Sequence, residues 1–195
     1  AYSIQAALQS GLFQEVMVST NDPEIAEIAK KYGAKVPFMR SEETANDFAT
    51  LADVVDEVKA SYLKIDRTFN YICVILPTAP LIKPETLKKA FEKLTNQKLP
   101  YLCSIVKYSY PIHRAVAVNN EGKIEFLFPN WFSSRSQDIK ASYHDAGQFY
   151  WAIYETALRC EDKYGFEIPE TLVQDIDCEV DWETAEFKYK LKNIY

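Results

Sequence analysis

Hydrophobic and polar positions alternate along this chain in blocks that predict helices and strands in turn. Stretches with apolar residues at helical spacing are separated by short, nearly continuous apolar runs. Helices are predicted at residues 1–10, 21–33, 48–62 and 84–94, and strands at residues 15–20, 35–39, 71–76 and 101–106. Because this repetition has βαβ spacing, it predicts an α/β fold with an open, mostly parallel sheet.

The rhythm changes in the second half of the chain. Residues 107–142 contain two short runs joined by Asn119-Asn120-Glu121-Gly122, which predict a β-hairpin, followed by an aromatic and polar segment. We interpret residues 107–142 as an arm inserted into a single domain, residues 1–195, that serves as a lid or a subunit contact. A strand at residues 148–154 and an amphipathic helix from Glu179 complete the pattern.

Two carboxylates lie close together in sequence just before this last helix. Asp175 and Asp177 follow Leu172 and Val173, which we interpret as the end of a buried strand. In extended backbone a spacing of two points both carboxylates to one side. Two hard oxygen ligands suit Mg²⁺, which completes its shell with phosphates and water. The alternative is that one aspartate caps the helix and the other is solvated.

The densest group of polar side chains is the segment Tyr143–Trp151, where Tyr, His and Gln surround Gly147. Such side chains bond hydroxyls and amides, as carbohydrate sites require, and a glycine lets a ligand approach the backbone. The alternative is an aromatic strand whose polar residues face solvent. Arg40 follows a predicted edge strand, at the rim where α/β sheets bind ligands. Otherwise it is an ordinary surface arginine.

Composition narrows the range of functions. The 195 residues are 48% hydrophobic and 26% charged, with a net charge of −6, so no basic footprint for nucleic acid or an anionic membrane is present. No apolar run reaches the length of a membrane span. Four scattered cysteines favour a reduced, cytoplasmic setting. Five isolated glycines allow no glycine-rich phosphate loop, and two histidines allow no three-histidine metal site.

Several short motifs match one known family in their order and spacing. They are Ala1-Tyr2-Ser3-Ile4, Val16-Met17-Val18-Ser19-Thr20, Arg40–Asp47, Pro77-Thr78-Ala79-Pro80, Ser109–Ile112, Arg135-Ser136-Gln137-Asp138, Tyr143–Trp151, and Asp175-Ile176-Asp177 with Asp181-Trp182. Each motif is weakly specific alone, but together they cover nearly the whole chain. The chain thus resembles the acylneuraminate cytidylyltransferase family, and most closely its pseudaminic acid branch.

This resemblance implies a three-layer, Rossmann-like nucleotidyltransferase of the nucleotide-diphospho-sugar transferase type. It implies transfer of a cytidylyl group from CTP to a nine-carbon α-keto acid (nonulosonic acid) sugar, with Mg²⁺ on the phosphates. It also implies a homodimer paired through the arm. By position, Asp175 and Asp177 are expected to hold the metal and serve catalysis. The residues expected to line the nucleotide pocket are Arg40, Thr50 and Thr78, and those expected to face the sugar are Arg135, Tyr143, His144 and Gln148.

Departures from the family pattern bear on the substrate and on activity. Sialic acid enzymes carry Gln where this chain has Leu76, and Asn where it has Ala146, which favours pseudaminic acid over N-acetylneuraminate. The strand and the Ala-Arg-Gly-Gly-Ser-Lys type loop that open family members are absent before Ala1. We therefore expect these residues alone to turn over CTP poorly.

Three alternatives stay open at this point. The first is an enzyme for N-acylneuraminate or a legionaminic acid relative. The second is a GT-A glycosyltransferase, whose Asp-x-Asp motif also holds a metal on a nucleotide sugar, although there the motif follows a mid-chain strand. The third is a non-catalytic binding or assembly module that has lost its phosphate loop.

Overall fold

The computed structural model describes residues 1–192, and the last three residues of the predicted 1–195 domain lie outside this range. The class is α/β, as predicted, but three helices precede the first strand, so the predicted alternation of helices and strands holds only from residue 51 onward. The helices are α1 (Tyr2–Ser10), α2 (Pro23–Lys31), α3 (Leu51–Leu63), α4 (Pro84–Asn96) and α5 (Glu179–Lys192). The strands are β1 (Tyr71–Ile75), β2 (Tyr101–Lys107), β3 (Val116–Val118), β4 (Ile124–Phe126), β5 (Tyr143–Ile153) and β6 (Tyr164–Glu167).

The central sheet is mixed and has the strand order β1-β5-β2-β6. β5 pairs antiparallel with β1 on one side and with β2 on the other, whereas β2 and β6 are parallel. Three of the four strands therefore run in one direction and β5 runs in the other. β6 was not predicted, because its four residues lack a run of apolar side chains.

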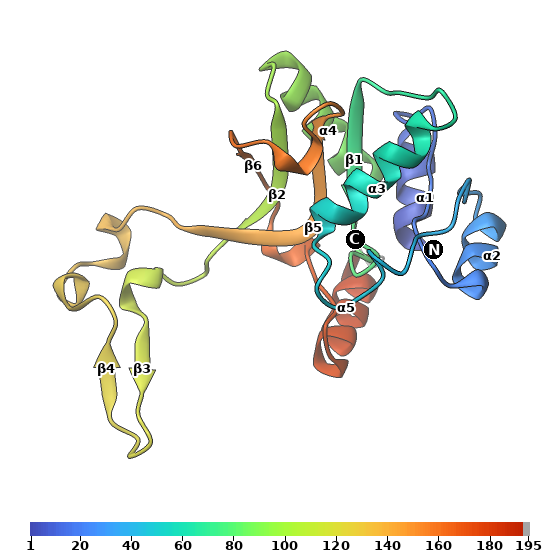
Figure 1. The fold of residues 1–195 in the computed structure, drawn as a ribbon. Coiled ribbons are helices and arrows are strands. Elements are labelled where there is room, and N and C mark those ends of the chain that lie inside the picture. The colour runs from blue at the N-terminus through green and yellow to red at the C-terminus, as the bar shows by residue number, and fades with distance from the viewer. Residues whose placement is uncertain (193–195) are drawn as a thin grey trace.

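Helices cover both faces of this sheet (Figure 1). α3 lies across one face, while α1 and α4, which contact each other, lie on the other. Leu87 and Leu94 of α4 pack with Phe149 and Trp151 of β5 in the main hydrophobic core. The ring of Trp151 also stacks on Phe13, at a centroid distance of 5.2 Å. The predicted three-layer arrangement follows from these contacts.

Capping residues set the helix ends at short range. Gly11 ends α1 in the left-handed conformation, with φ +66°, as its position predicts. The Asp22 carboxylate accepts the Glu24 and Ile25 backbone N–H groups and starts α2. Thr50 forms a capping box with Asp53, so α3 begins at Leu51 rather than at residue 48.

Residues 15–20 and 35–39 are not strands, contrary to prediction. Within residues 1–192 they share a single parallel bridge, Met17–Lys35. On the other side of residues 15–19 lies an apolar groove of about 450 Å³, bounded by β1, α1 and α3. An extended segment becomes a strand only when neighbouring backbone groups pair with it, and here the groove separates it from β1. β1 therefore lies at the sheet edge and is half-buried.

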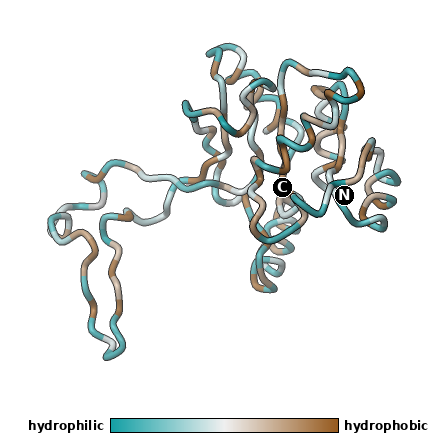
Figure 2. Tube along the Cα trace, in the orientation of Figure 1, coloured by the Kyte–Doolittle hydropathy of each residue, from teal (hydrophilic) through white to brown (hydrophobic). Residues whose placement is uncertain are grey.

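The predicted arm is present and contains the predicted hairpin, formed by β3 and β4. It projects well away from the sheet and its helices (Figure 1). Apolar stretches run along both of its strands, as they do along the strands of the body (Figure 2). Among residues 1–192, no helix has the length and apolar character needed to span a bilayer.

Candidate functional site

The Asp175 carboxylate lies directly against the backbone of Gly147 in β5. Asp175 belongs to the loop between a 3-10 turn, Glu170–Leu172, and α5; the predicted end of a strand at Leu172 and Val173 is wrong. Gly147 has φ +59°, and a Cβ atom there would lie 2.8 Å from Asp175 Cγ and nearer still to Oδ2. Only glycine fits here, because another residue would be strained at this φ and its Cβ would clash with the carboxylate.

One oxygen of this carboxylate has no bonding partner in the described range. Asp175 Oδ1 is buried and accepts no hydrogen bond from residues 1–192. An unpaired buried acceptor costs free energy, so its persistence indicates a ligand position. Asp177, two residues on, is exposed. Within residues 1–192 no cluster of three or more His, Cys, Asp or Glu side chains forms a protein-only metal cage. Two carboxylates fit Mg²⁺, which binds few protein ligands and completes its shell with phosphate and water.

Gln148 is buried between β5 and the Asp175 loop. Its side chain is 1% exposed, and Nε2 donates to the backbone oxygen of Gln174 at 3.3 Å and to that of Ala146 at 3.0 Å. Its backbone oxygen accepts the Leu76 N–H at 3.1 Å, immediately after β1. Gln148 therefore joins the end of β1 to the Asp175 loop. Its expected contact with the sugar stays a prediction.

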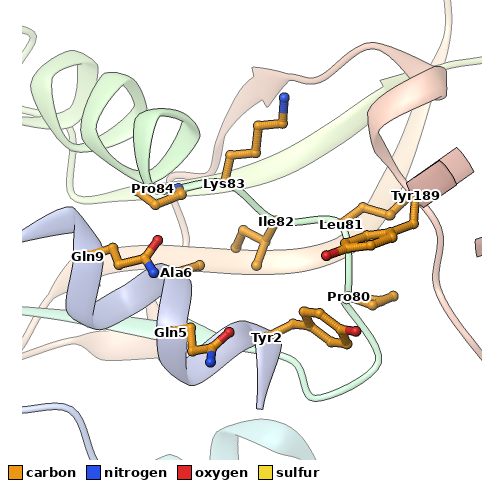
Figure 3. A pocket seen from close by; sticks show the side chains of 10 residues that line it. All are labelled: Tyr2, Gln5, Ala6, Gln9, Pro80, Leu81, Ile82, Lys83, Pro84 and Tyr189. Atoms are coloured by element: carbon orange, nitrogen blue, oxygen red, sulfur yellow. The ribbon is translucent and has the colours of Figure 1, made fainter. Parts of the chain in front are cut away.

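Thr78 lies in the turn that follows β1, next to this junction. It is half-buried, and the chain continues through Pro80 to Pro84 at the start of α4. Figure 3 shows that the Pro80–Pro84 segment, α1 and Tyr189 of α5 surround a small hollow of about 210 Å³. The rings of Tyr2 and Tyr189 meet across it, 5.5 Å apart. The segment that leads from this turn to α4 and the helix after Asp177 are thus neighbours.

Arg40 borders the apolar groove beside β1. Its guanidinium donates to Ser19, through Nε to the hydroxyl at 3.1 Å and through Nη2 to the backbone oxygen. Pro77, at the end of β1, lines the same groove, which brings Arg40 and the Thr78 turn to its margin. The half-buried guanidinium supplies positive charge there. Nucleotide binding by Arg40 and Thr78 stays a prediction.

Thr50 has a structural task in this structure. Its hydroxyl accepts the Asp53 N–H at 3.2 Å and donates to the Asp53 carboxylate at 2.6 Å. The Thr50 backbone N–H also donates to this carboxylate, at 2.8 Å, and the two donations lower the pKa of Asp53 to about 2. The Thr50 hydroxyl already caps α3. It could contact the nucleotide, as predicted, only by forming a further hydrogen bond beside those to Asp53.

Two of the residues expected to face the sugar stand at the exposed start of β5. Tyr143 is 41% exposed, and a hydrogen bond to Glu167 raises the pKa of its phenol. The His144 ring packs near Tyr108, at a centroid distance of 4.9 Å. Arg135 lies earlier in the chain, in the arm, where it pairs with Asp138 at 2.9 Å. Gly147, Gln148 and Asp175 meet in the body, while Arg135 belongs to the projecting arm.

Sequence reasoning missed three side chains that fix the Asp175 loop. They are Gln174, Asp181 and Lys188, which bond to the loop and to one another. A signal was present, because Asp181 stands three residues after Cys178, at capping-box spacing. Lys188 stands seven residues beyond Asp181, on the same face of α5.

Known proteins resemble the chain over nearly its full length. The family described as Cytidylyltransferase matches residues 1–192. A pseudaminic acid cytidylyltransferase of Campylobacter jejuni is 36% identical, over 99% of this chain and 85% of that protein. N-acylneuraminate cytidylyltransferase A of Danio rerio is 31% identical, over 94% of this chain and 43% of that protein. The solved structure of CMP:2-keto-3-deoxy-manno-octonic acid synthetase complexed with CTP superposes with a TM-score of 0.61 at 15% identity, covering 99% of this chain and 88% of that one. The structural match shows the fold.

Proposed function

Because the chain belongs to the cytidylyltransferase family, we propose that it transfers a cytidylyl group from CTP to a nine-carbon α-keto acid sugar, pseudaminic acid. The products are a CMP-sugar and pyrophosphate. The carrying observation is the Asp175 carboxylate, held against Gly147 with a buried, unpartnered oxygen. Family membership along residues 1–192 decides against the glycosyltransferase alternative.

The protein's own groups bind and orient the reactants around this carboxylate. Asp175 and Asp177 hold Mg²⁺, and the ion supplies positive charge to the triphosphate when bound. Arg40 offers a second cation at the margin of the groove, suited to an anionic nucleotide. The exposed side chains of Tyr143 and His144 offer hydrogen bonds to sugar hydroxyls. Positioning and electrostatics are what phosphoryl transfer requires of a protein.

Pyrophosphate release from CTP tests this proposal and separates the candidate sugars. Pseudaminic acid, N-acetylneuraminate and a legionaminic acid are offered singly and in competition. We expect the first to give the highest kcat/KM, and Asp175→Asn to lower it at least 100-fold, the usual order for a lost metal contact. Faster turnover of another nonulosonic acid would assign the chain to that substrate, and unchanged activity in Asp175→Asn would refute the metal role.

We infer that two copies pair through the arm. In the hairpin Val116 lies opposite Phe126 and Val118 opposite Ile124, so these four side chains share one face. All four are exposed, with exposed fractions of 43% for Val116, 42% for Phe126, 64% for Val118 and 57% for Ile124. An isolated two-stranded hairpin is marginal in water unless its apolar face is covered. A second copy of the same face covers it symmetrically.

A cytoplasmic location is part of the same proposal. All four cysteines are unpaired, and Cys73 and Cys103 lie on β1 and β2, the two strands on either side of β5. Free thiols are typical of a reducing compartment, where the nucleotide CTP is also available. Fractionation of cells that express the tagged protein measures this directly, and recovery from an oxidising compartment would contradict it.

One observation favours a second candidate, a module that binds CTP without turning it over. The free edge of β1 faces the apolar groove, and Arg40 stands at the groove margin without a phosphate loop beside it in residues 1–192. Calorimetry with CTP and Mg²⁺ separates the two candidates. Binding of CTP without release of pyrophosphate supports the module.

A further inference from the structure

The loop that carries Asp175 and Asp177 is organised around the side chain of Gln174. Its Oε1 accepts a hydrogen bond from Lys188 Nζ at 3.1 Å. Its Nε2 donates to Asp181 Oδ1 and to the Asp175 backbone oxygen, both at 3.1 Å. The orientation of the amide is therefore fixed, because its oxygen faces an ammonium group and its nitrogen faces a carboxylate.

Lys188 attaches the loop to α5 through two further bonds. Its ammonium donates to the Val173 backbone oxygen at 2.6 Å and to the Glu170 backbone oxygen at 3.1 Å. With Gln174 Oε1 these acceptors use all three N–H donors of the lysine. Partial burial lowers the pKa of Lys188 from its usual range. The lysine thus serves the loop and is not a free surface cation.

Asp181 holds the other side of the loop. Its Oδ2 accepts the backbone N–H groups of Asp177 and Cys178, each at 3.1 Å, while Oδ1 accepts from Gln174. Both oxygens are therefore engaged within the protein, in contrast to Asp175 Oδ1, which is buried without a partner. Asp181 fixes the backbone that precedes α5 and is not a third metal ligand.

We propose that Gln174 and Lys188 are positioning residues that set the metal affinity of the Asp175–Asp177 pair. The two residues touch neither the proposed metal nor the nucleotide. They act by holding the backbone on both sides of Asp175, so that its carboxylate stays pressed on Gly147. Groups of this kind around a metal site change its affinity by about 10- to 100-fold when removed. This inference rests on the proposed metal role of Asp175.

The test measures binding of Mn²⁺ to the full chain through the loss of the paramagnetic signal of the free ion. CTP is left out, because it binds Mn²⁺ itself. Gln174→Leu and Lys188→Met are expected to weaken Mn²⁺ binding about 10- to 100-fold. The control is Lys190→Met, which removes an exposed lysine from the same helix. The ion-pair partner of Lys190 within residues 1–192 is Glu186. This variant is expected to bind Mn²⁺ within twofold of the unaltered chain.

The outcomes separate this inference from the proposed function. If Asp175→Asn abolishes Mn²⁺ binding but Gln174→Leu leaves it unchanged, the positioning role is overturned and the metal site stands. If Asp175→Asn leaves binding unchanged, the metal site and the inference both fail. Should Gln174→Leu not fold, Lys188→Met carries the test, because it removes the ammonium donors and leaves Gln174 in place. If the two residues only stabilise the fold, their replacement lowers the melting temperature but leaves the Mn²⁺ affinity of the folded variants unchanged, which also overturns the positioning role.

Discussion

Replacement of Gly147 by alanine is a sharp test of the site, because two separate effects act at one position. The backbone has φ +59°, where an L-residue with a Cβ is strained. The added Cβ would also lie 2.8 Å from Asp175 Cγ, while ordinary contact begins at 3.4 Å. The Asp175 carboxyl carbon must therefore retreat by at least 0.6 Å, the difference between these two distances.

The magnitudes follow from these two effects. The left-handed conformation costs about 1–2 kcal/mol for a residue with a Cβ. Alanine recovers about 0.4–1 kcal/mol by restricting the unfolded chain. The net loss of about 1 kcal/mol lowers the melting temperature by about 2–4 °C for a domain of this size. Functional groups must be held within about 0.5 Å, so the displaced carboxylate is expected to lower Mn²⁺ affinity and turnover about 10- to 100-fold.

Gly11→Ala is the matched control. Gly11 has φ +66°, close to the value at Gly147, but nothing lies within 4 Å of an added Cβ. Both variants should lose similar stability in a thermal melt, whereas Mn²⁺ binding and pyrophosphate release should fall in Gly147→Ala alone. Equal Mn²⁺ affinity in the two variants would refute the idea that Gly147 is required for the placement of Asp175.

Two further predictions concern other parts of the molecule. Although burial opposes the effect, hydrogen bonds from Tyr62, Lys35 and Arg67 lower the pKa of Glu15 from 4.5 to about 2. This carboxylate therefore contributes up to about 3 kcal/mol of stability above pH 4.5, and this contribution is lost as the pH falls toward 2. In urea melts across this pH range, the free energy of unfolding should decline less steeply in Glu15→Gln than in the unaltered chain. In the hairpin, Val118→Asp should convert a dimer to a monomer in light scattering, whereas Ala117→Asp, on the opposite face, should not. If both variants are monomers, or if both are dimers, pairing through the apolar face is contradicted.

The candidate site was only partly readable from sequence. The Asp-x-Asp spacing and the glycine in the polar segment identified two elements, and the structure shows that Asp175 and Gly147 touch. The roles of Thr50 and Gln148 were not readable, because a threonine before a helix and a glutamine in a strand look alike whether they bind ligand or protein. Their partners, Asp53 and the Gln174 backbone oxygen, appear only once the chain is folded. The spacing of Lys188 from Asp181 placed both on one face of α5, but it did not show that the lysine bonds the Asp175 loop.

The sequence by itself determined the features that depend on neighbours a few residues away. The stop at Gly11, the start at Asp22 and the hairpin turn all use groups within one or two turns of chain, so their signals are local. Tertiary structure alone decided the strand pairing. Residues 15–20 have a strand-like pattern, yet they are not a strand, because their backbone faces an apolar groove where a neighbour would have to pair. The position of β5 between β1 and β2, the burial of Gln148 and the clamp on the Asp175 loop likewise arise from residues distant in the sequence, whose contacts no local pattern encodes.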